Sequence, residues 1–215
     1  MKALLVSDVH GNLPALETVL QKETDYDQII SLGDVVNYGP WGNECVDLLE
    51  NKGAINLVGN HEEYFLQGSY PGPSALVKQF FKVCYMDFQR MGVIGKYRSE
   101  YIIGKFICRH TIGDLYVFQD TPVTIDANTI IGHSHSQFTR QVDGFTLVNT
   151  GSVGQNRREI NVINYATYDT ASDDMVLKEV VYDHNLVIQK MREKNYPEEC
   201  LNYYLGKSIR SKPAQ

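Results

Sequence analysis

The sequence lacks the cysteine pattern of a zinc ribbon or a disulfide framework. No Cys-x-x-Cys pair occurs, and the four cysteines are widely separated: Cys45, Cys84, Cys108 and Cys200. Closely spaced thiolate pairs mark zinc ribbons, and disulfide-stapled domains carry cysteine at a much higher density. The sequence therefore predicts a protein whose thiols stay reduced.

The chain also lacks a long apolar run and an excess of positive charge. Its first apolar stretch, 3–6, is interrupted by Ser7 and Asp8 and is too short for a signal peptide or a membrane span. The formal net charge of −6 argues against general affinity for nucleic acid or anionic membranes, but not against a small phosphorylated ligand. We therefore expect a cytoplasmic protein without a nucleic-acid or membrane partner. Its oligomeric state is left open.

The first sixty residues alternate between short apolar runs and amphipathic segments. The runs 3–6, 29–32 and 55–58 are typical of strands buried on both faces, whereas 12–21 and 43–51 have apolar residues at helical spacing. This β-α-β-α-β order favours an α/β fold. The length of 215 residues suits one large domain, and no linker or repeat divides the chain.

The second half of the chain has a different character. After a Pro- and Gly-rich break at 68–73, residues 74–91 have the spacing of an amphipathic helix. Turn residues then separate six β-rich runs, which predict a largely antiparallel second sheet: 101–103, 106–108, 129–131, 145–148, 162–168 and 176–182. Helices are expected at 185–193 and 198–205.

Polar residues gather where the predicted strands end. The first three strands are followed by an Asp-x-His, a Gly-Asp and a Gly-Asn-His-Glu motif, and two later apolar runs are followed by histidines. Ligand sites of open α/β sheets lie outside the carboxyl ends of the strands, so these side chains are expected to meet at one edge. They are Asp8, His10, Asp34, Asn60, His61, His110, His133 and His135.

Each of these residues also has a structural explanation when it is taken alone. Asp8 could cap a turn, the Gly-Asp pair is common turn chemistry, and Asn60 could occupy a left-handed turn position. His110 could be a hydrogen-bonded structural histidine. His133 and His135 stand two residues apart, as strand residues on one face do, so both rings can face one site.

Together these residues form a donor set of carboxylate, amide and imidazole groups without a thiolate. This mixture suits a dinuclear site for Mn, Fe, Co, Ni or Zn better than a thiolate zinc site or an all-oxygen calcium site. A carboxylate has two oxygens and can bridge two cations. Asp34 is therefore predicted to hold two metal ions roughly 3.5–4 Å apart.

In this order, the motifs resemble those of the calcineurin-like metallophosphoesterases, most closely the small bacterial and archaeal phosphodiesterase branch. The resemblance extends to the stretches SDVHGNLPALETVL, GDVVNYGPWGNECVDLL and VNTGSVGQNR. It implies a single domain over 1–215 with an αββα sandwich, in which helices flank two mixed sheets in four layers. Residues 64–105 would form a variable helical insert near the site, and 183–215 a C-terminal helical extension.

The resemblance also implies a role for each site residue. One metal would be held by Asp8, His10 and His135, the other by Asn60, His110 and His133, and Asp34 would bridge them. Two divalent transition-metal ions are expected as cofactors, with Mn the first choice. His61 would not bind metal but would face the substrate, either protonating the leaving oxygen or stabilising charge on phosphorus. Tyr38 and Arg157 are predicted to contact the substrate.

These roles predict a phosphoesterase in which two cations convert a bridging water into a hydroxide that attacks phosphorus. The phosphoprotein-phosphatase branch has the motif GDxVDRG, whose Arg grips phosphate. Here Tyr38 takes that place, which favours a phosphodiester or a small phosphorylated molecule as the substrate. The alternatives are a non-catalytic metal-binding scaffold and a regulatory module on the same fold. Scaffold members tend to lose the histidine that is present here as His61, and a turnover assay distinguishes the regulatory module.

Overall fold

The computed structural model describes residues 1–211, which form two five-stranded sheets with helices around them. The strands are β1 (Lys2–Val6), β2 (Gln28–Ser31), β3 (Ile55–Asn56), β4 (Glu100–Ile103), β5 (Phe106–Arg109), β6 (Asn128–Ile131), β7 (Phe138–Val142), β8 (Phe145–Asn149), β9 (Val162–Asp169) and β10 (Asp174–Val181). The helices are α1 (Leu13–Lys22), α2 (Gly42–Asn51), α3 (Asn60–Gln67), α4 (Ala75–Met86), α5 (Met91–Ile94), α6 (Asn185–Glu193) and α7 (Glu198–Leu205).

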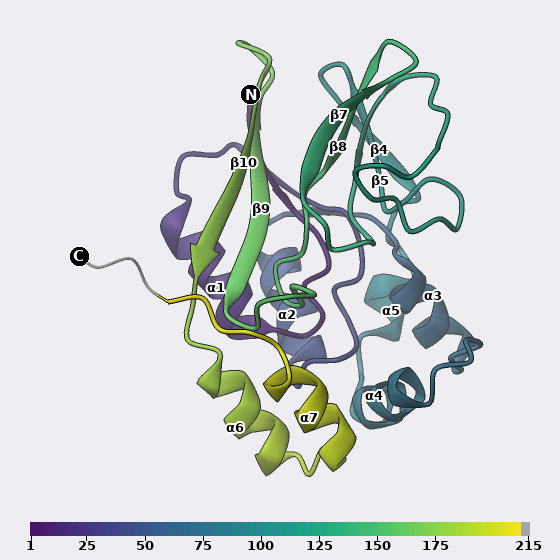
Figure 1. Ribbon diagram of the computed structural model, residues 1–215, viewed down its shortest axis with the longest axis vertical. Coiled ribbons are helices and arrows are strands. Elements are labelled where there is room, and N and C mark those ends of the chain that lie inside the picture. Colours follow the sequence, from purple (N-terminus) through teal and green to yellow (C-terminus); the bar gives the residue numbers. More distant parts are fainter. Residues whose placement is uncertain (212–215) are drawn as a thin grey trace.

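The strand order is β10-β9-β1-β2-β3 in the first sheet and β4-β5-β6-β8-β7 in the second. Figure 1 shows the two sheets beside each other, with α4, α6 and α7 below them. Each sheet contains both parallel and antiparallel pairs. The predicted class, two mixed sheets flanked by helices, is therefore confirmed.

Strand β1 shows why the first sheet is buried on both faces. Successive side chains of a strand point to opposite faces. Accordingly, Leu4 and Val6 enter the core beneath the helices, whereas Ala3 and Leu5 enter the core between the two sheets. Because both faces are covered, the strand consists of consecutive apolar residues rather than alternating ones.

The expectation of a largely antiparallel second sheet is wrong. Strand β6 pairs in parallel with both β5 and β8, so only the outer pairs of that sheet are antiparallel. Strands β9 and β10 do not belong to it, because β9 pairs with β1 in the first sheet. The alternation of apolar residues predicts a strand, but it does not identify the strand's partner.

Two elements of the structure, α3 and β7, lie wholly outside the segments that the sequence patterns predicted. The helix predicted over 74–91 ends at Met86, with Asp87 as its C-cap, and α5 follows as a separate turn. The predicted extension 183–215 contains α6 and α7, and its last residues, 212–215, lie outside the described part.

Over residues 1–211, no helix combines the length and the apolar character needed to cross a membrane.

Candidate metal centre

The structure brings together all eight polar residues that the sequence placed at strand ends. Each lies in the loop or helix start that directly follows a strand, and the two sheets carry these loops to one place. Asp8 and His10 follow β1, Asp34 follows β2, Asn60 and His61 begin α3, His110 follows β5, and His133 and His135 follow β6. All are buried except the half-buried Asn60.

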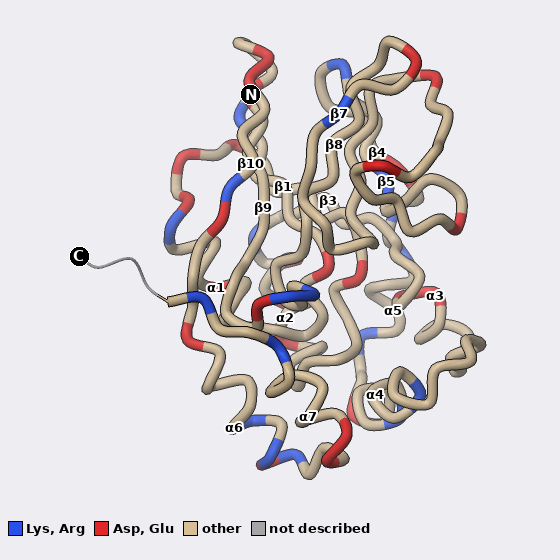
Figure 2. Tube along the Cα trace, viewed as in Figure 1, with Lys and Arg blue, Asp and Glu red and all other residues tan. Residues whose placement is uncertain are grey.

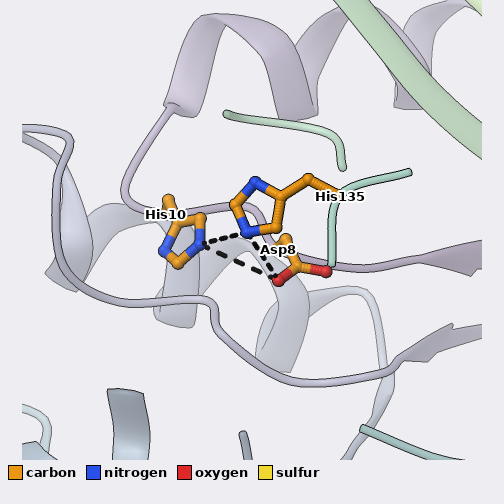
Figure 3. A group of neighbouring side chains, drawn as sticks. All are labelled: Asp8, His10 and His135. Atoms are coloured by element: carbon orange, nitrogen blue, oxygen red, sulfur yellow. Dashed lines mark hydrogen bonds and ion pairs between the residues drawn. The ribbon is translucent and has the colours of Figure 1, made fainter. Parts of the chain in front are cut away.

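The first group consists of Asp8, His10 and His135. The Nε2 atoms of His10 and His135 are 3.2 Å apart, and Asp8 Oδ1 lies 3.1 Å from His135 Nε2 and 3.8 Å from His10 Nε2. Figure 3 shows the two rings and the carboxylate directed at a common point. The geometry thus unites the three residues that were predicted to share one metal.

The second group consists of Asn60, His110 and His133. His110 Nε2 lies 3.2 Å from Asn60 Oδ1 and 3.1 Å from His133 Nδ1. Asp34 connects the two groups, because its Oδ2 lies 3.2 Å from His110 Nε2 and 4.0 Å from His10 Nε2. Asp34 therefore has the position that a bridging carboxylate requires.

The ring orientations fit cation binding. In three of the histidines, Nδ1 faces a main-chain carbonyl, which can only accept a hydrogen bond, so Nδ1 carries a proton and Nε2 is the nitrogen whose lone pair a metal would bind when the ring is neutral. Across the 3.2 Å between His10 and His135, two such lone pairs would face each other, and a shared cation removes that repulsion. The three contacts are His10 to Val36 at 3.1 Å, His110 to Leu32 at 2.8 Å and His135 to Gln155 at 2.6 Å.

The carboxylate of Asp8 gives a second test of this fit. Its Oδ2 accepts hydrogen bonds from Ser7 Oγ at 2.5 Å and from the main-chain nitrogen of His133 at 3.0 Å. Its Oδ1 is buried and has no hydrogen-bond partner among residues 1–211. Because an unpartnered buried carboxylate oxygen is costly, its orientation toward two imidazole nitrogens indicates a place for a cation.

The charges of the second group depend on one another. Burial disfavours the charged form of His110, but the charge and hydrogen bond of Asp34, together with the charges of Asp8 and Glu62, outweigh burial and raise the pKa of His110 to about 10. Burial and the charge of His110 lower the pKa of His133 to about 4. In the protein chain alone, a proton on His110 thus balances Asp34, whose charge a bound cation would otherwise balance.

His61 is fixed by contacts at both its main chain and its ring. Its main-chain nitrogen donates to Asp34 Oδ1 at 2.8 Å, and its Nδ1 lies 2.9 Å from the side-chain amide of Asn37. Burial lowers the pKa of the ring. His61 also lies close enough to His10 and Asp34 to form a third possible metal group. Its role as a proton donor rather than a ligand therefore stays a prediction.

The loops that carry these residues have an unusual backbone. Positive φ angles occur at five of the candidate ligands: Asp8 (53°), His10 (48°), Asp34 (54°), His133 (64°) and His135 (58°). Each such residue costs about 1–3 kcal/mol and persists only where the surroundings enforce it. Gly132 is part of this constraint, because a Cβ there would lie 1.9 Å from Ser7 Oγ. Asn60, by contrast, begins α3 and is not in a left-handed turn.

Glu62 is a supporting residue to which the sequence analysis gave no role. Its buried carboxylate accepts hydrogen bonds at 2.8 Å from the main-chain nitrogens of Asp34, Val35 and Gly59. It therefore fixes the loop after β2 against the start of α3. The available signal was its place, three residues after Gly59 at a helix start, where a Glu commonly caps the helix.

The two predicted substrate contacts lie beside the first group. Tyr38 is buried, with its ring centroid 4.8 Å from that of His10 and 5.3 Å from that of His61. Arg157 lies on the loop between β8 and β9, where its Nη1 donates to Tyr203 Oη at 3.4 Å. Their contact with a substrate stays a prediction.

A cleft of about 560 Å³ opens beside the second group. Asn60, His110 and His133 are among the residues that line it. The segment predicted as a variable insert contributes to the walls of the cleft: Tyr64, Ser99 and Glu100. Tyr116 also lines the cleft, with its ring centroid 4.1 Å from that of His133. A substrate can therefore reach the candidate metal centre from this side.

Comparison with known proteins gives one family and several similar chains. The calcineurin-like phosphoesterase family matches residues 1–188. An uncharacterized protein of Methanocaldococcus jannaschii is 26% identical over an alignment of 235 positions, gaps included, and the alignment covers 90% of this chain and 93% of that protein.

Two solved structures extend the comparison. A metallophosphoesterase from Sphaerobacter thermophilus is 26% identical, with a TM-score of 0.75 and coverage of 95% of this chain and 99% of its own. A hypothetical protein from Pyrococcus horikoshii OT3 is 14% identical, with a TM-score of 0.78 and coverage of 94% and 97%. At that identity, the second likeness concerns the fold alone.

Proposed function

The chain belongs to the calcineurin-like phosphoesterase family, and on that premise we propose that it is a phosphodiesterase that works with two divalent metal ions. The observation that carries the proposal is the arrangement around Asp34. Its Oδ2 lies 3.2 Å from His110 Nε2 in one group and 4.0 Å from His10 Nε2 in the other. A structural role would not require a buried carboxylate to face two sets of imidazole nitrogens.

Seven residues would hold the metals. Asp8, His10 and His135 would bind one ion, Asn60, His110 and His133 the other, and Asp34 both. With imidazole, carboxylate and amide donors and no thiolate, Mn, Fe, Co, Ni and Zn all suit the site, and Mn is our first choice. When bound, such ions supply a water-derived nucleophile at neutral pH and neutralise the phosphoryl oxygens.

The protein's own residues would then orient the reaction and move its proton. Asn37 holds one ring nitrogen of His61, at 2.9 Å, which leaves the other ring nitrogen for the leaving oxygen. His61 would donate its proton there as the ester bond breaks. Asp34 Oδ1 accepts from the main-chain nitrogen of His61 at 2.8 Å, so the proton donor and the bridging carboxylate are positioned together.

The choice of a diester rests on Tyr38. A phosphate monoester dianion carries more negative charge than a diester monoanion, and therefore benefits more from an additional cation. Where the phosphoprotein-phosphatase motif supplies an Arg, this chain has a buried tyrosine packed against His10 and His61. The missing charge favours the monoanionic diester.

A paired hydrolysis assay tests the proposal. Bis-p-nitrophenyl phosphate and p-nitrophenyl phosphate share a leaving group and differ in charge, so we expect the diester to give the higher kcat/KM. Exhaustive chelation should abolish turnover, and Mn should restore it as the metal content returns to about two ions per chain. Turnover that survives chelation refutes the metal mechanism. Metal binding without turnover would indicate the scaffold or regulatory alternative, and a preference for the monoester would indicate a phosphatase.

A further inference from the structure

Two cationic side chains, Arg157 and Lys207, are held together beside the first metal group. Lys207, which follows α7, donates from Nζ to the main-chain oxygen of Asn156 at 2.8 Å. Arg157 is the next residue along that loop. Tyr203 contacts both cations, because its ring centroid is 4.6 Å from Lys207 Nζ and its hydroxyl accepts from Arg157 Nη1 at 3.4 Å.

Neither cation has an acidic partner. Among residues 1–211, no carboxylate lies within 4.0 Å of the charged nitrogens of Arg157 or Lys207. The nearby Arg210 differs, because it pairs with both Glu159 and Glu179. Burial and the charge of Arg157 together lower the pKa of Lys207 to about 7. Two adjacent cations without an acid repel each other, and an anion that contacts both would relieve that repulsion.

This cationic pair adjoins the reaction centre. The ring of Tyr203 lies 6.4 Å from that of Tyr38, which in turn packs against His10. The loop that carries Arg157 also supplies the carbonyl of Gln155, which accepts from His135 Nδ1 at 2.6 Å. A group bound by Arg157 and Lys207 can therefore belong to the same ligand as a phosphate at the metal centre.

The cleft beside the second group has the opposite charge. It is lined by the acidic residues Glu63, Glu100 and Asp114. Within residues 1–211, Arg109 is the one Arg or Lys that lines this cleft, and its Nη2 lies 3.5 Å from Glu100 Oε2. Figure 2 shows that Lys and Arg elsewhere are interspersed with Asp and Glu along the trace. An additional anionic group of a substrate is thus repelled by the cleft and attracted to Arg157 and Lys207.

Resting on the proposed phosphodiesterase function, we propose that Arg157 and Lys207 form a subsite for a second phosphate group of the substrate. The preferred substrate would then carry one phosphate that is hydrolysed at the metal centre and another that stays intact between these two cations. Arg157 can bind phosphate oxygens through two N–H groups, and Lys207 adds a compact charge beside it. Tyr203 positions both side chains.

Two substrates that differ only in the second phosphate provide the kinetic test. Thymidine 5′-(p-nitrophenyl phosphate) and its 3′-phosphorylated form release the same p-nitrophenol from the same nucleoside. We expect the full-length metal-loaded protein to favour the 3′-phosphorylated form by about tenfold or more in kcat/KM, mainly through KM, as for a charge-assisted contact. A ratio near one in the wild type overturns the subsite.

Variants then locate the preference. Lys207→Met keeps the stem over the tyrosine rings and removes the charge, and should lower the kcat/KM ratio about fivefold or more. Lys207→Arg should retain most of the ratio, which excludes a merely structural loss. The matched control Lys52→Met removes an exposed cation outside this group and should leave the ratio unchanged. A ratio that survives both Lys207→Met and Arg157→Met contradicts the proposal.

A binding measurement separates this inference from the proposed function, because it needs no turnover. Inorganic diphosphate is titrated calorimetrically into the full-length protein after chelation and dialysis, with circular dichroism to verify the fold. The wild type should bind one diphosphate, and Lys207→Met should weaken the Kd about fivefold or more. Binding without any hydrolytic activity would support the subsite and overturn the phosphodiesterase. Hydrolysis without diphosphate binding or a substrate preference would overturn the subsite alone.

Discussion

Replacing His61 with alanine should separate proton donation from metal binding. The substitution removes the ring but keeps the main-chain nitrogen that donates to Asp34 Oδ1 at 2.8 Å. Asp34 therefore remains oriented, and both metals should stay bound. The ring of His61 is buried, and its hydrogen bond within residues 1–211 is to Asn37. Removing the ring should therefore lower turnover rather than metal content, by roughly 10²–10⁴-fold for a poor leaving group.

The size of that loss should depend on the leaving group. p-Nitrophenolate departs without protonation, so the loss for bis-p-nitrophenyl phosphate should be about tenfold or less, whereas phenyl and alkyl diesters should show the full loss. The assay compares log kcat/KM with the leaving-group pKa over a series of aryl diesters, for the wild type and the variant. The slope should be steeper in His61→Ala.

Two results would refute this reasoning. The first is a metal content that falls in His61→Ala, because His61 would then be a ligand in the group that it forms with His10 and Asp34. The second is an equal loss for good and poor leaving groups, which would leave no role for a proton donor. His184→Ala is the matched control, because His184 lies at the N-cap of α6 rather than in the site; it should change neither metal content nor slope.

Three further predictions follow from the same geometry. Asp34→Asn should lose at least one metal and most activity. If the amide oxygen of the new side chain keeps the hydrogen bond from the main-chain nitrogen of His61, its NH₂ group must face both cations. Two bound metals with full activity would show that the charge of Asp34 is unnecessary. His110→Ala should reduce the metal content from about two ions per chain to about one, and a content of two or zero would refute its assignment to a separate second site. Lys207 has a pKa of about 7 in the folded chain against an ordinary 10.5. Between these two pH values the unfolded chain binds more protons than the folded chain, so the free energy of unfolding rises with pH. In metal-free protein, the free energy of unfolding measured in urea should therefore increase more for the wild type than for Lys207→Met between pH 6.5 and 9.5. If the two plots of unfolding free energy against pH run parallel, the lowered pKa of Lys207 is wrong.

Local patterns were sufficient for most elements but not for α3 and β7. Helix α3 begins after Gly59, which has no side chain to cap it. Its first residues are polar residues of the site, so the helix lacks the regular spacing of apolar residues that predicts a helix. Strand β7 lies at the edge of the second sheet and alternates between buried and exposed positions over only five residues. Both elements are formed because neighbouring segments pack against them, a tertiary effect that short-range patterns do not contain.

Pairing was the other part that the sequence left undecided. The apolar run of β9 predicts a strand, but its partner is β1 at the opposite end of the chain rather than the strands that precede it. Hydrogen-bonded ladders form between any two extended segments of suitable register, so sequence order alone could not assign β9 to the first sheet.

The sequence by itself determined which donors reach the candidate centre and in what order, because each motif directly follows a strand and needs only local structure to reach the sheet edge. Only the tertiary structure decided how those donors are aimed. The carbonyls of Leu32 and Gln155, which fix the protonated nitrogen of His110 and His135, come from other loops. The same holds for Arg157 and Lys207, which become neighbours because α7 folds back onto the loop after β8. Charge repulsion, hydrogen bonding and burial act over a few ångströms, and those distances exist only once the chain has folded.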